Sequence, residues 1–193
     1  MIGSFAVCSD GNFISALQHG FAFINRENGE KKFIADPESA LPGNRFNDGK
    51  CDPAGRFWAG SMSFNTTDAS ASLYQLNRNL EVSKHATGIT ISNGLDWSLD
   101  KKTFYYIDTP TFNVDEFDYD NESGEISNRR TIIQIPKEDG FPDGMCIDAA
   151  GMLWIAHWGG WQVTRWNPTT GHKMDAIKLP VSQVTCVVLG EKI

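Results

Sequence analysis

Residues Asn47–Trp58 read NDGKCDPAGRFW, and this short stretch decides how the chain is organised. The same order of features returns in Asn93–Tyr106 (NGLDWSLDKKTFYY) and in Asp143–Trp154 (DGMCIDAAGMLW). Each copy holds a polar residue, a short apolar strand, a turn and an aromatic-rich strand. Residues recur at a step of 48 positions: Asp52, Asp100 and Asp148, and Trp58, Tyr106 and Trp154. A fixed step of this length indicates repeated supersecondary units.

A second marker keeps nearly the same step. Turn-forming segments that end in glycine occur at Asn25–Gly29, Asp120–Gly124 and Asn167–Gly171. No stretch of the chain has convincing helical periodicity. A unit of about 48 residues holds about four strands, which is the size of a propeller blade. We therefore predict an all-β fold in which residues 1–193 form a single β-propeller domain of about four blades. A β-sandwich with accidental self-similarity is the alternative.

Composition excludes several classes of function. The chain has 193 residues and a net charge of −7, which argues against the basic surface that nucleic acids require. No run of about 18 apolar residues predicts a membrane span, and we expect no signal peptide. The four cysteines form no CxxC pair, and we expect Cys51 and Cys146 to be buried, reduced thiols. The sequence thus predicts a cytoplasmic protein.

The repeated polar residue before each apolar strand is the strongest functional signal. In a ring of repeats, equivalent positions converge on the central axis, so Asn47, Asn93 and Asp143 would meet there. Carboxamide and carboxylate oxygens are ligands that a hard divalent cation prefers. Asn-Gly and Asp-Gly are also common hairpin signals, so plain turns are the alternative. We interpret four other aspartates as turn formers rather than metal ligands: Asp48, Asp52, Asp100 and Asp148.

Three segments resemble the regucalcin/gluconolactonase family of senescence marker protein-like lactonases. They are Asn44–Gly60 (NRFNDGKCDPAGRFWAG), Ile91–Ser98 (ISNGLDWS) and Pro142–Asp148 (PDGMCID). The resemblance covers nearly the whole chain, and its first motif is long enough to be specific. It implies a six-bladed propeller with a divalent metal on its axis and hydrolysis of sugar lactones such as gluconolactone.

The same resemblance assigns roles to individual residues. It implies that Asn93 and Asp143 are metal ligands, with calcium first and zinc, manganese or magnesium as alternatives. It implies that Arg45 and Asn47 line the substrate pocket, and that Asp143 is also the general base. No nucleic acid or membrane partner is implied, and the oligomeric state stays open.

The chain also departs from the family pattern. The family's third protein ligand is a glutamate in the first blade, and we expect this chain to begin after it. Asn65 takes the place of a substrate-binding glutamate, and the last blade is absent by the same alignment. The sequence therefore resembles the middle of a lactonase, about four blades of six.

Two further functions compete with lactone hydrolysis. The missing glutamate and Asn65 favour a non-catalytic propeller that binds calcium or a protein partner. A metal-dependent hydrolase acting on phosphotriesters is the other alternative. His157 is a weaker candidate base, which we expect just after a strand. The chain has no nucleophile elbow and no phosphate-binding glycine loop, which argues against a serine hydrolase and a P-loop enzyme.

Overall fold

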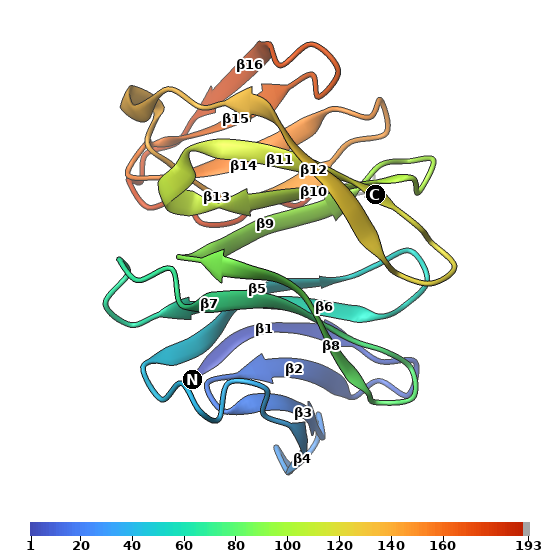
Figure 1. Ribbon diagram of the computed structural model, residues 1–193. Coiled ribbons are helices and arrows are strands. Elements are labelled where there is room, and N and C mark those ends of the chain that lie inside the picture. Colours follow the sequence, from blue (N-terminus) through green and yellow to red (C-terminus); the bar gives the residue numbers. More distant parts are fainter. Residues whose placement is uncertain (191–193) are drawn as a thin grey trace. The chain divides into compact units, whose positions relative to one another are not determined.

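The structure is a computed structural model that describes residues 1–190, and its regular secondary structure is almost entirely β-strand. The described chain forms four separate four-stranded antiparallel sheets, each with its strands in chain order (Figure 1). Two compact units divide the chain, Met1–Ser92 and a second that begins at Asn93. Because the sheets are four and separate, the β-sandwich alternative is wrong.

Each sheet is a meander of short strands. The first holds β1 (Ile2–Val7), β2 (Phe13–Leu17), β3 (Gly20–Ile24) and β4 (Lys31–Ala35). The second holds β5 (Asn44–Cys51), β6 (Phe57–Ser63), β7 (Ala71–Leu76) and β8 (Val82–Ile89). The third holds β9 (Ser92–Trp97), β10 (Thr103–Asp108), β11 (Asn113–Tyr119) and β12 (Ile126–Gln134). The fourth holds β13 (Phe141–Ile147), β14 (Leu153–Trp158), β15 (Gln162–Trp166) and β16 (Lys173–Lys178).

Helical structure in the described residues is limited to two short 3₁₀ turns, η1 (Thr109–Thr111) and η2 (Lys137–Asp139). The predicted absence of α-helices therefore holds for residues 1–190. None of the helical segments in this range has the length and apolar character needed to cross a membrane.

The first unit buries apolar side chains between its two sheets. Phe21 packs against Phe46 with ring centroids 4.8 Å apart, and Phe46 meets Tyr74 edge-on at 5.8 Å. The first strands of the two sheets approach closely, since a Cβ on Gly3 would lie 2.6 Å from the carbonyl oxygen of Asn47. Only glycine leaves room for this contact.

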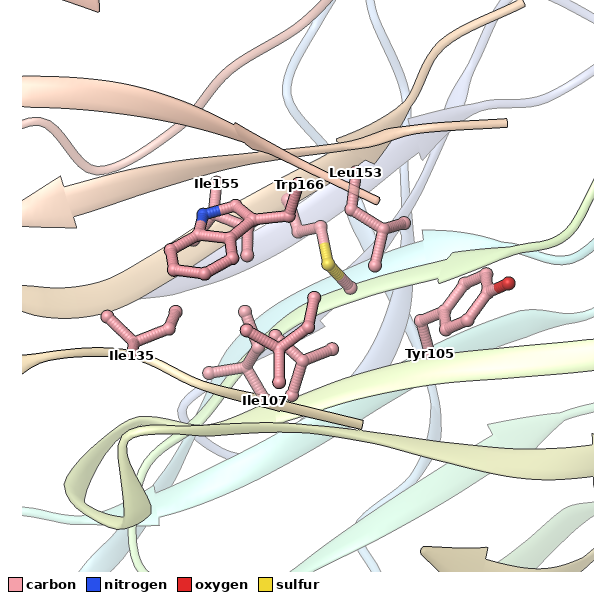
Figure 2. Close-up of a cluster of buried hydrophobic side chains, with 9 residues drawn as sticks. Tyr105, Ile107, Ile135, Leu153, Ile155 and Trp166 are labelled. Carbon is pink, nitrogen blue, oxygen red and sulfur yellow. The ribbon is translucent and has the colours of Figure 1, made fainter. Parts of the chain in front are cut away.

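The second unit has its own core (Figure 2). Its buried members lie on β10 to β15 and just after β12: Tyr105, Ile107, Val114, Ile133, Ile135, Met145, Leu153, Ile155 and Trp166. Large apolar side chains of this kind contribute about 1.5–3 kcal/mol each when they are fully buried. This core joins the third and fourth sheets, since it takes side chains from both.

Two of the first strands, β5 and β13, carry an extra residue at equivalent positions. In β5, Phe46 pairs with Ser61 and Gly49 pairs with Ala59. Two residues of β5 therefore lie between these pairs, opposite a single residue of β6. In β13, Pro142 pairs with His157 and Met145 with Ile155, which gives the same excess. The extra residue marks a β-bulge, which bends the strand and redirects a side chain. Asn47 and Asp143 lie inside these two bulges.

The predicted polar positions therefore do not sit in hairpin turns. Asn93 belongs to β9 and Asp143 to β13, so the plain-turn alternative is wrong for both residues. Asp48 lies within β5, and its assignment as a turn former is wrong as well. The glycines of these pairs are explained by close packing instead, since an added Cβ would lie 2.6 Å from the carbonyl oxygen of Asp143 at Gly94 and 2.7 Å from that of Thr185 at Gly144.

The turn aspartates show which positions are truly equivalent. Asp52 and Asp148 each accept the backbone N–H groups of the following turn, at 2.9 Å, and the indole N–H of Trp58 or Trp154, at 3.0 Å. In the third sheet this place belongs to Ser98, whose hydroxyl accepts the N–H of Thr103 at 2.9 Å.

The turn between β9 and β10, which begins at Ser98, contains one residue more than the turns that begin at Asp52 and Asp148. The additional residue shifts β10 by one position in the sequence. Asp100 still forms part of the turn, accepting the Lys102 N–H at 3.1 Å. Tyr105, opposite Glu116, matches the position of Trp58 opposite Gln75. The exact 48-residue spacing of Asp100 and Tyr106 is therefore a coincidence of turn length.

Two minor expectations also changed. Cys146 is buried as predicted, but Cys51 is exposed at the end of β5. His157 lies within β14 rather than after it and is fully buried.

Candidate functional site

Arg45 and Asn47, the predicted substrate-binding residues, lie together in the first unit. The guanidinium Nη1 of Arg45 donates to the carbonyl oxygen of Phe46 at 2.9 Å and to Oδ1 of Asn47 at 3.0 Å. Nδ2 of Asn47 donates to the carbonyl oxygen of Ser92 at 2.8 Å. These bonds fix the orientation of the Asn47 amide and hold the Arg45 guanidinium beside it.

The electrostatics around this pair are shaped by partial burial. Burial lowers the pKa of the Arg45 guanidinium, which nevertheless remains charged at neutral pH because its unperturbed value is so high. Burial also raises the pKa of the Asp48 carboxyl, while the Gly49 N–H and the charge of Lys50 act in the opposite direction. The Arg45 guanidinium, with a lowered pKa, and the Asp48 carboxyl, with a raised pKa, thus lie at the bulge of β5.

A buried carboxylate, which sequence reasoning missed, anchors the start of β5. Glu38 is 4% exposed and accepts hydrogen bonds from Nδ2 of Asn44 at 2.7 Å, the Ser61 hydroxyl at 2.9 Å and the Tyr74 hydroxyl at 2.7 Å. Burial, followed by the bond to Glu38, raises the pKa of Tyr74. Because Asn44 directly precedes Arg45, this hydrogen-bond network holds the backbone next to the candidate substrate-binding residue in place.

Asn93 and Asp143, the predicted metal ligands, are brought together in the second unit. A Cβ on Gly94 would lie 2.6 Å from the carbonyl oxygen of Asp143 and 2.7 Å from Cβ of Met145. The backbones of β9 and β13 therefore meet next to both candidate ligands. Asn93 is 6% exposed, whereas Asp143 is half-buried.

A threonine hydroxyl links the two strands at this point. Nδ2 of Asn93 donates to Oγ1 of Thr109 at 2.7 Å, and that hydroxyl donates to the carbonyl oxygen of Pro142 at 2.8 Å. Pro142 is the residue immediately before Asp143. Sequence reasoning missed Thr109, because a lone threonine after a strand carries no distinctive pattern.

The donor atoms suit a hard cation in kind. Asn93 and Asp143 offer carboxamide and carboxylate oxygens, which calcium and magnesium prefer over softer ligands. Within residues 1–190, no three or more His, Cys, Asp or Glu side chains gather in an arrangement able to hold a metal ion. Asn93 and Asp143 are thus two candidate donors, one neutral and one acidic.

Asn65, aligned with a substrate-binding glutamate, is an exposed residue engaged in its own turn. Its Oδ1 accepts the Ser63 hydroxyl at 2.8 Å and the N–H groups of Thr67 and Asp68 at 3.2 Å. Its Nδ2 donates to the carboxylate of Asp68. The amide stabilises the loop between β6 and β7.

His157 belongs to the interior of the fourth sheet. Its Nε2 lies 2.6 Å from the Thr164 hydroxyl, which also accepts the indole N–H of Trp166 at 2.6 Å. Burial lowers the pKa of the His157 imidazole; Asp139 opposes this shift, and Lys173 and Lys178 add to it. Full burial and the contact with Thr164 identify His157 as a core residue.

Comparisons with known proteins identify the family of the chain. Residues 1–193 match the sequence model of the SMP-30/Gluconolactonase/LRE-like region. Regucalcin of Xenopus laevis is 44% identical over 194 residues, covering 98% of this chain and 65% of that protein. The chain thus spans about two thirds of the length of this relative.

Two solved structures are also similar. A luciferin-regenerating enzyme has a TM-score of 0.90 at 34% identity, covering 98% of this chain and 66% of that one. A calcium-binding protein, regucalcin from Agrobacterium tumefaciens, has a TM-score of 0.90 at 30% identity, covering 96% and 63%. The sheets are blades of an incomplete β-propeller, as predicted. The chain belongs to the SMP-30/gluconolactonase/LRE-like family.

Proposed function

We propose that this chain carries part of the site of a metal-dependent sugar lactonase. Asn93 and Asp143 would hold a divalent cation, with calcium as the first choice. Arg45 and Asn47 would bind the sugar oxygens of the lactone. Membership in a family named for gluconolactonase supports the substrate class. The observation that carries the metal assignment is the Asn93–Thr109–Pro142 hydrogen-bond chain, which ends next to Asp143.

The chemistry assigned to each residue follows from its functional groups. When bound, a divalent cation supplies Lewis-acid stabilisation of the charge that develops on the lactone carbonyl oxygen. Asp143 would accept a proton from the attacking water, and a general base of this kind contributes about 10²–10⁴ in rate. Arg45 would hold substrate oxygens with parallel N–H donors, and its contact with Asn47 restricts its side chain in advance.

Metal titration tests the first step of this proposal. The 193-residue chain is titrated calorimetrically with calcium, magnesium, manganese and zinc, alongside Asp143→Asn. Asp175→Asn, an exposed carboxylate on β16, is the matched control. We expect saturable binding to the wild type and the control, and a loss of at least tenfold in Asp143→Asn, since a carboxylate ligand has become neutral. Equal affinity in all three proteins would contradict the assignment of Asp143.

Hydrolysis of gluconolactone tests the second step. The rate is followed with and without a chelator, which should abolish a metal-dependent reaction. In Asp143→Asn we expect the metal-dependent rate to fall by about 10² or more, because both the ligand charge and the base are lost. A chelator-resistant rate that is equal in the variant would exclude this mechanism.

One observation favours a second function, calcium binding without turnover. The side chain of Asn65 is committed to its own loop and to Asp68, so it is poorly disposed to replace a substrate-binding glutamate. The two experiments separate the alternatives. Saturable binding without hydrolysis supports the binding module, whereas binding with chelator-sensitive hydrolysis supports the lactonase.

We infer a small-molecule sugar lactone as the partner and the cytoplasm as the location. A net charge of −7 is consistent with a lack of nucleic-acid binding. Fractionation of cells that express a tagged chain checks the location, and recovery in the membrane fraction would overturn it.

A further inference from the structure

We propose that Thr109 is a positioning residue that sets the orientation of the Asn93 carboxamide, and so determines which of its atoms is directed toward a divalent cation held with Asp143. This inference deepens the proposed function, since the cation is part of that proposal. The orientation of the amide itself follows from hydrogen-bond geometry, whether or not a cation binds. Thr109 is not a ligand in this account, because it acts through Asn93.

The single proton of the Thr109 hydroxyl decides the orientation of the Asn93 amide. A threonine hydroxyl has one proton to donate and two lone pairs that accept. The carbonyl oxygen of Pro142 can only accept, so the Thr109 proton must point to it. Thr109 Oγ1 is therefore left as an acceptor toward Asn93, and Asn93 must present its NH₂ group to it. The opposite amide orientation would face two acceptors against each other.

Burial gives this choice of orientation its strength. Asn93 is 6% exposed and Thr109 is 7% exposed, so water is largely excluded from both groups. A buried polar atom that loses its partner carries its full desolvation penalty. The amide nitrogen of Asn93 is thereby fixed against Thr109, which directs the amide oxygen away from that hydroxyl.

The local chain holds Thr109 rigidly. It opens η1, in which Pro110 restricts the backbone and the Phe112 N–H closes the turn on the carbonyl oxygen of Thr109 at 3.2 Å. The Thr111 hydroxyl donates to the carbonyl oxygen of Asp108 at 2.7 Å. A β-branched side chain also has few accessible χ1 values. The hydroxyl is thus an inflexible reference point for Asn93.

The equivalent asparagine in the second sheet shows what the hydroxyl adds. Nδ2 of Asn47 donates directly to the carbonyl oxygen of Ser92, the residue before Asn93. Nδ2 of Asn93 reaches the carbonyl oxygen of Pro142, the residue before Asp143, only through Thr109. In both sheets the amide donates toward the first strand of the next sheet, but the Thr109 hydroxyl lies between the Asn93 amide and the carbonyl oxygen of Pro142. At Asn47 the amide oxygen is bonded to Arg45, whereas at Asn93 we assign it to the cation.

Three variants test the positioning role. Thr109→Val keeps the shape of the side chain and removes the hydroxyl, and Thr109→Ser restores it. Thr111→Val is the matched control, because it removes another hydroxyl bond from the same 3₁₀ turn without touching Asn93. The Asn93 side-chain NH₂ signals are identified by NMR as the pair that disappears in Asn93→Asp.

The first readout needs no metal. We expect the Asn93 NH₂ protons to exchange roughly tenfold faster in Thr109→Val, the factor that corresponds to the loss of one hydrogen bond. Thr109→Ser and Thr111→Val should behave like the wild type. Unchanged exchange in Thr109→Val, or an equal change in Thr111→Val, would overturn the inference. Should Thr109→Val fail to fold, an absent NOE between the Asn93 NH₂ and the Thr109 side chain in the wild type would overturn it equally.

The second readout is calorimetric titration with calcium. We expect Thr109→Val to bind about 10- to 100-fold more weakly, as is usual when the support of a metal ligand is removed. Thr109→Ser should recover most of the affinity. A wild type that binds no cation, with fast NH₂ exchange in Thr109→Val, would refute the proposed function and leave the orienting role standing. Intact binding in every variant would refute the role of Thr109 toward the cation.

Discussion

The α-carbon of Gly94 faces the carbonyl oxygen of Asp143 so closely that an added Cβ would lie 2.6 Å from that oxygen. This contact joins β9 to β13 beside both candidate metal ligands. Because the neighbour is backbone, it cannot move aside as the tip of a flexible side chain can. The glycine of the Asn93-Gly94 pair is thus required by packing between two strands rather than by a turn.

The first prediction concerns this contact. Gly94→Ala should destabilise the protein by about 1–3 kcal/mol, the usual cost of overpacking a closely packed site. Gly43→Ala is the matched control, since a Cβ there meets no atom within 4 Å. Urea unfolding followed by tryptophan fluorescence measures both. Equal stability of the two variants would show that β9 and β13 are further apart than described.

A second prediction tests which turn residues are equivalent. Oδ2 of Asp52 accepts from Nε of Arg56 at 2.5 Å and from the Trp58 indole, and the carboxylate is buried. Asp52→Asn should cost about 3–5 kcal/mol, because it breaks a buried ion pair from one side. Asp100→Asn retains an acceptor in an exposed turn and should leave the unfolding midpoint nearly unchanged. A similar loss of unfolding free energy in both variants would mean that Asp52 and Asp100 are equivalent residues, as the exact 48-residue spacing predicts.

The third prediction concerns the buried carboxylate of Glu38. In Glu38→Gln an NH₂ group replaces one acceptor oxygen and faces the donor of Asn44 or those of Ser61 and Tyr74. We expect a loss of about 1–3 kcal/mol for the group left without a matching partner.

Thermal and urea unfolding measure the effect of Glu38→Gln. Glu81→Gln is the control, because Glu81 makes a single exposed side-chain bond, to Asn77. A destabilised control or a stable Glu38→Gln would mean that the network contributes nothing specific.

The fourth prediction is a pH dependence that arises from His157. Because burial lowers its pKa in the folded state, the unfolded chain binds a proton at higher pH than the folded chain does. Stability contributed by the neutral imidazole is therefore present above an unfolded pKa of about 6.5 and falls as the pH drops below that value.

Unfolding free energies between pH 7.5 and 5 measure this slope. We expect His157→Gln to flatten it and His172→Gln, at an exposed position, to leave it as in the wild type. A slope that is the same in all three proteins would assign the acid sensitivity to groups other than His157.

Several features could be anticipated from residue types alone. Glycine-, aspartate- and asparagine-rich turns between short aromatic and β-branched runs predicted strands, and their spacing predicted the four sheets. Asp52 and Asp148 were identifiable as turn formers because an aspartate at that place accepts nearby backbone N–H groups. These properties depend on contacts within a few residues, which a local pattern records.

Other features depend on which segments meet after folding. Asn93 and Asp143 are 50 positions apart, and only the approach of β9 to β13 brings them together. The bulges of β5 and β13 are extra residues counted against a partner strand, so they appear only once the strands are paired. Thr109 and Glu38 gave no local signal, because each acts through groups distant in the chain. Residue order determined the blades and their polar repeat, whereas strand pairing and buried hydrogen bonds decided how those polar side chains are oriented.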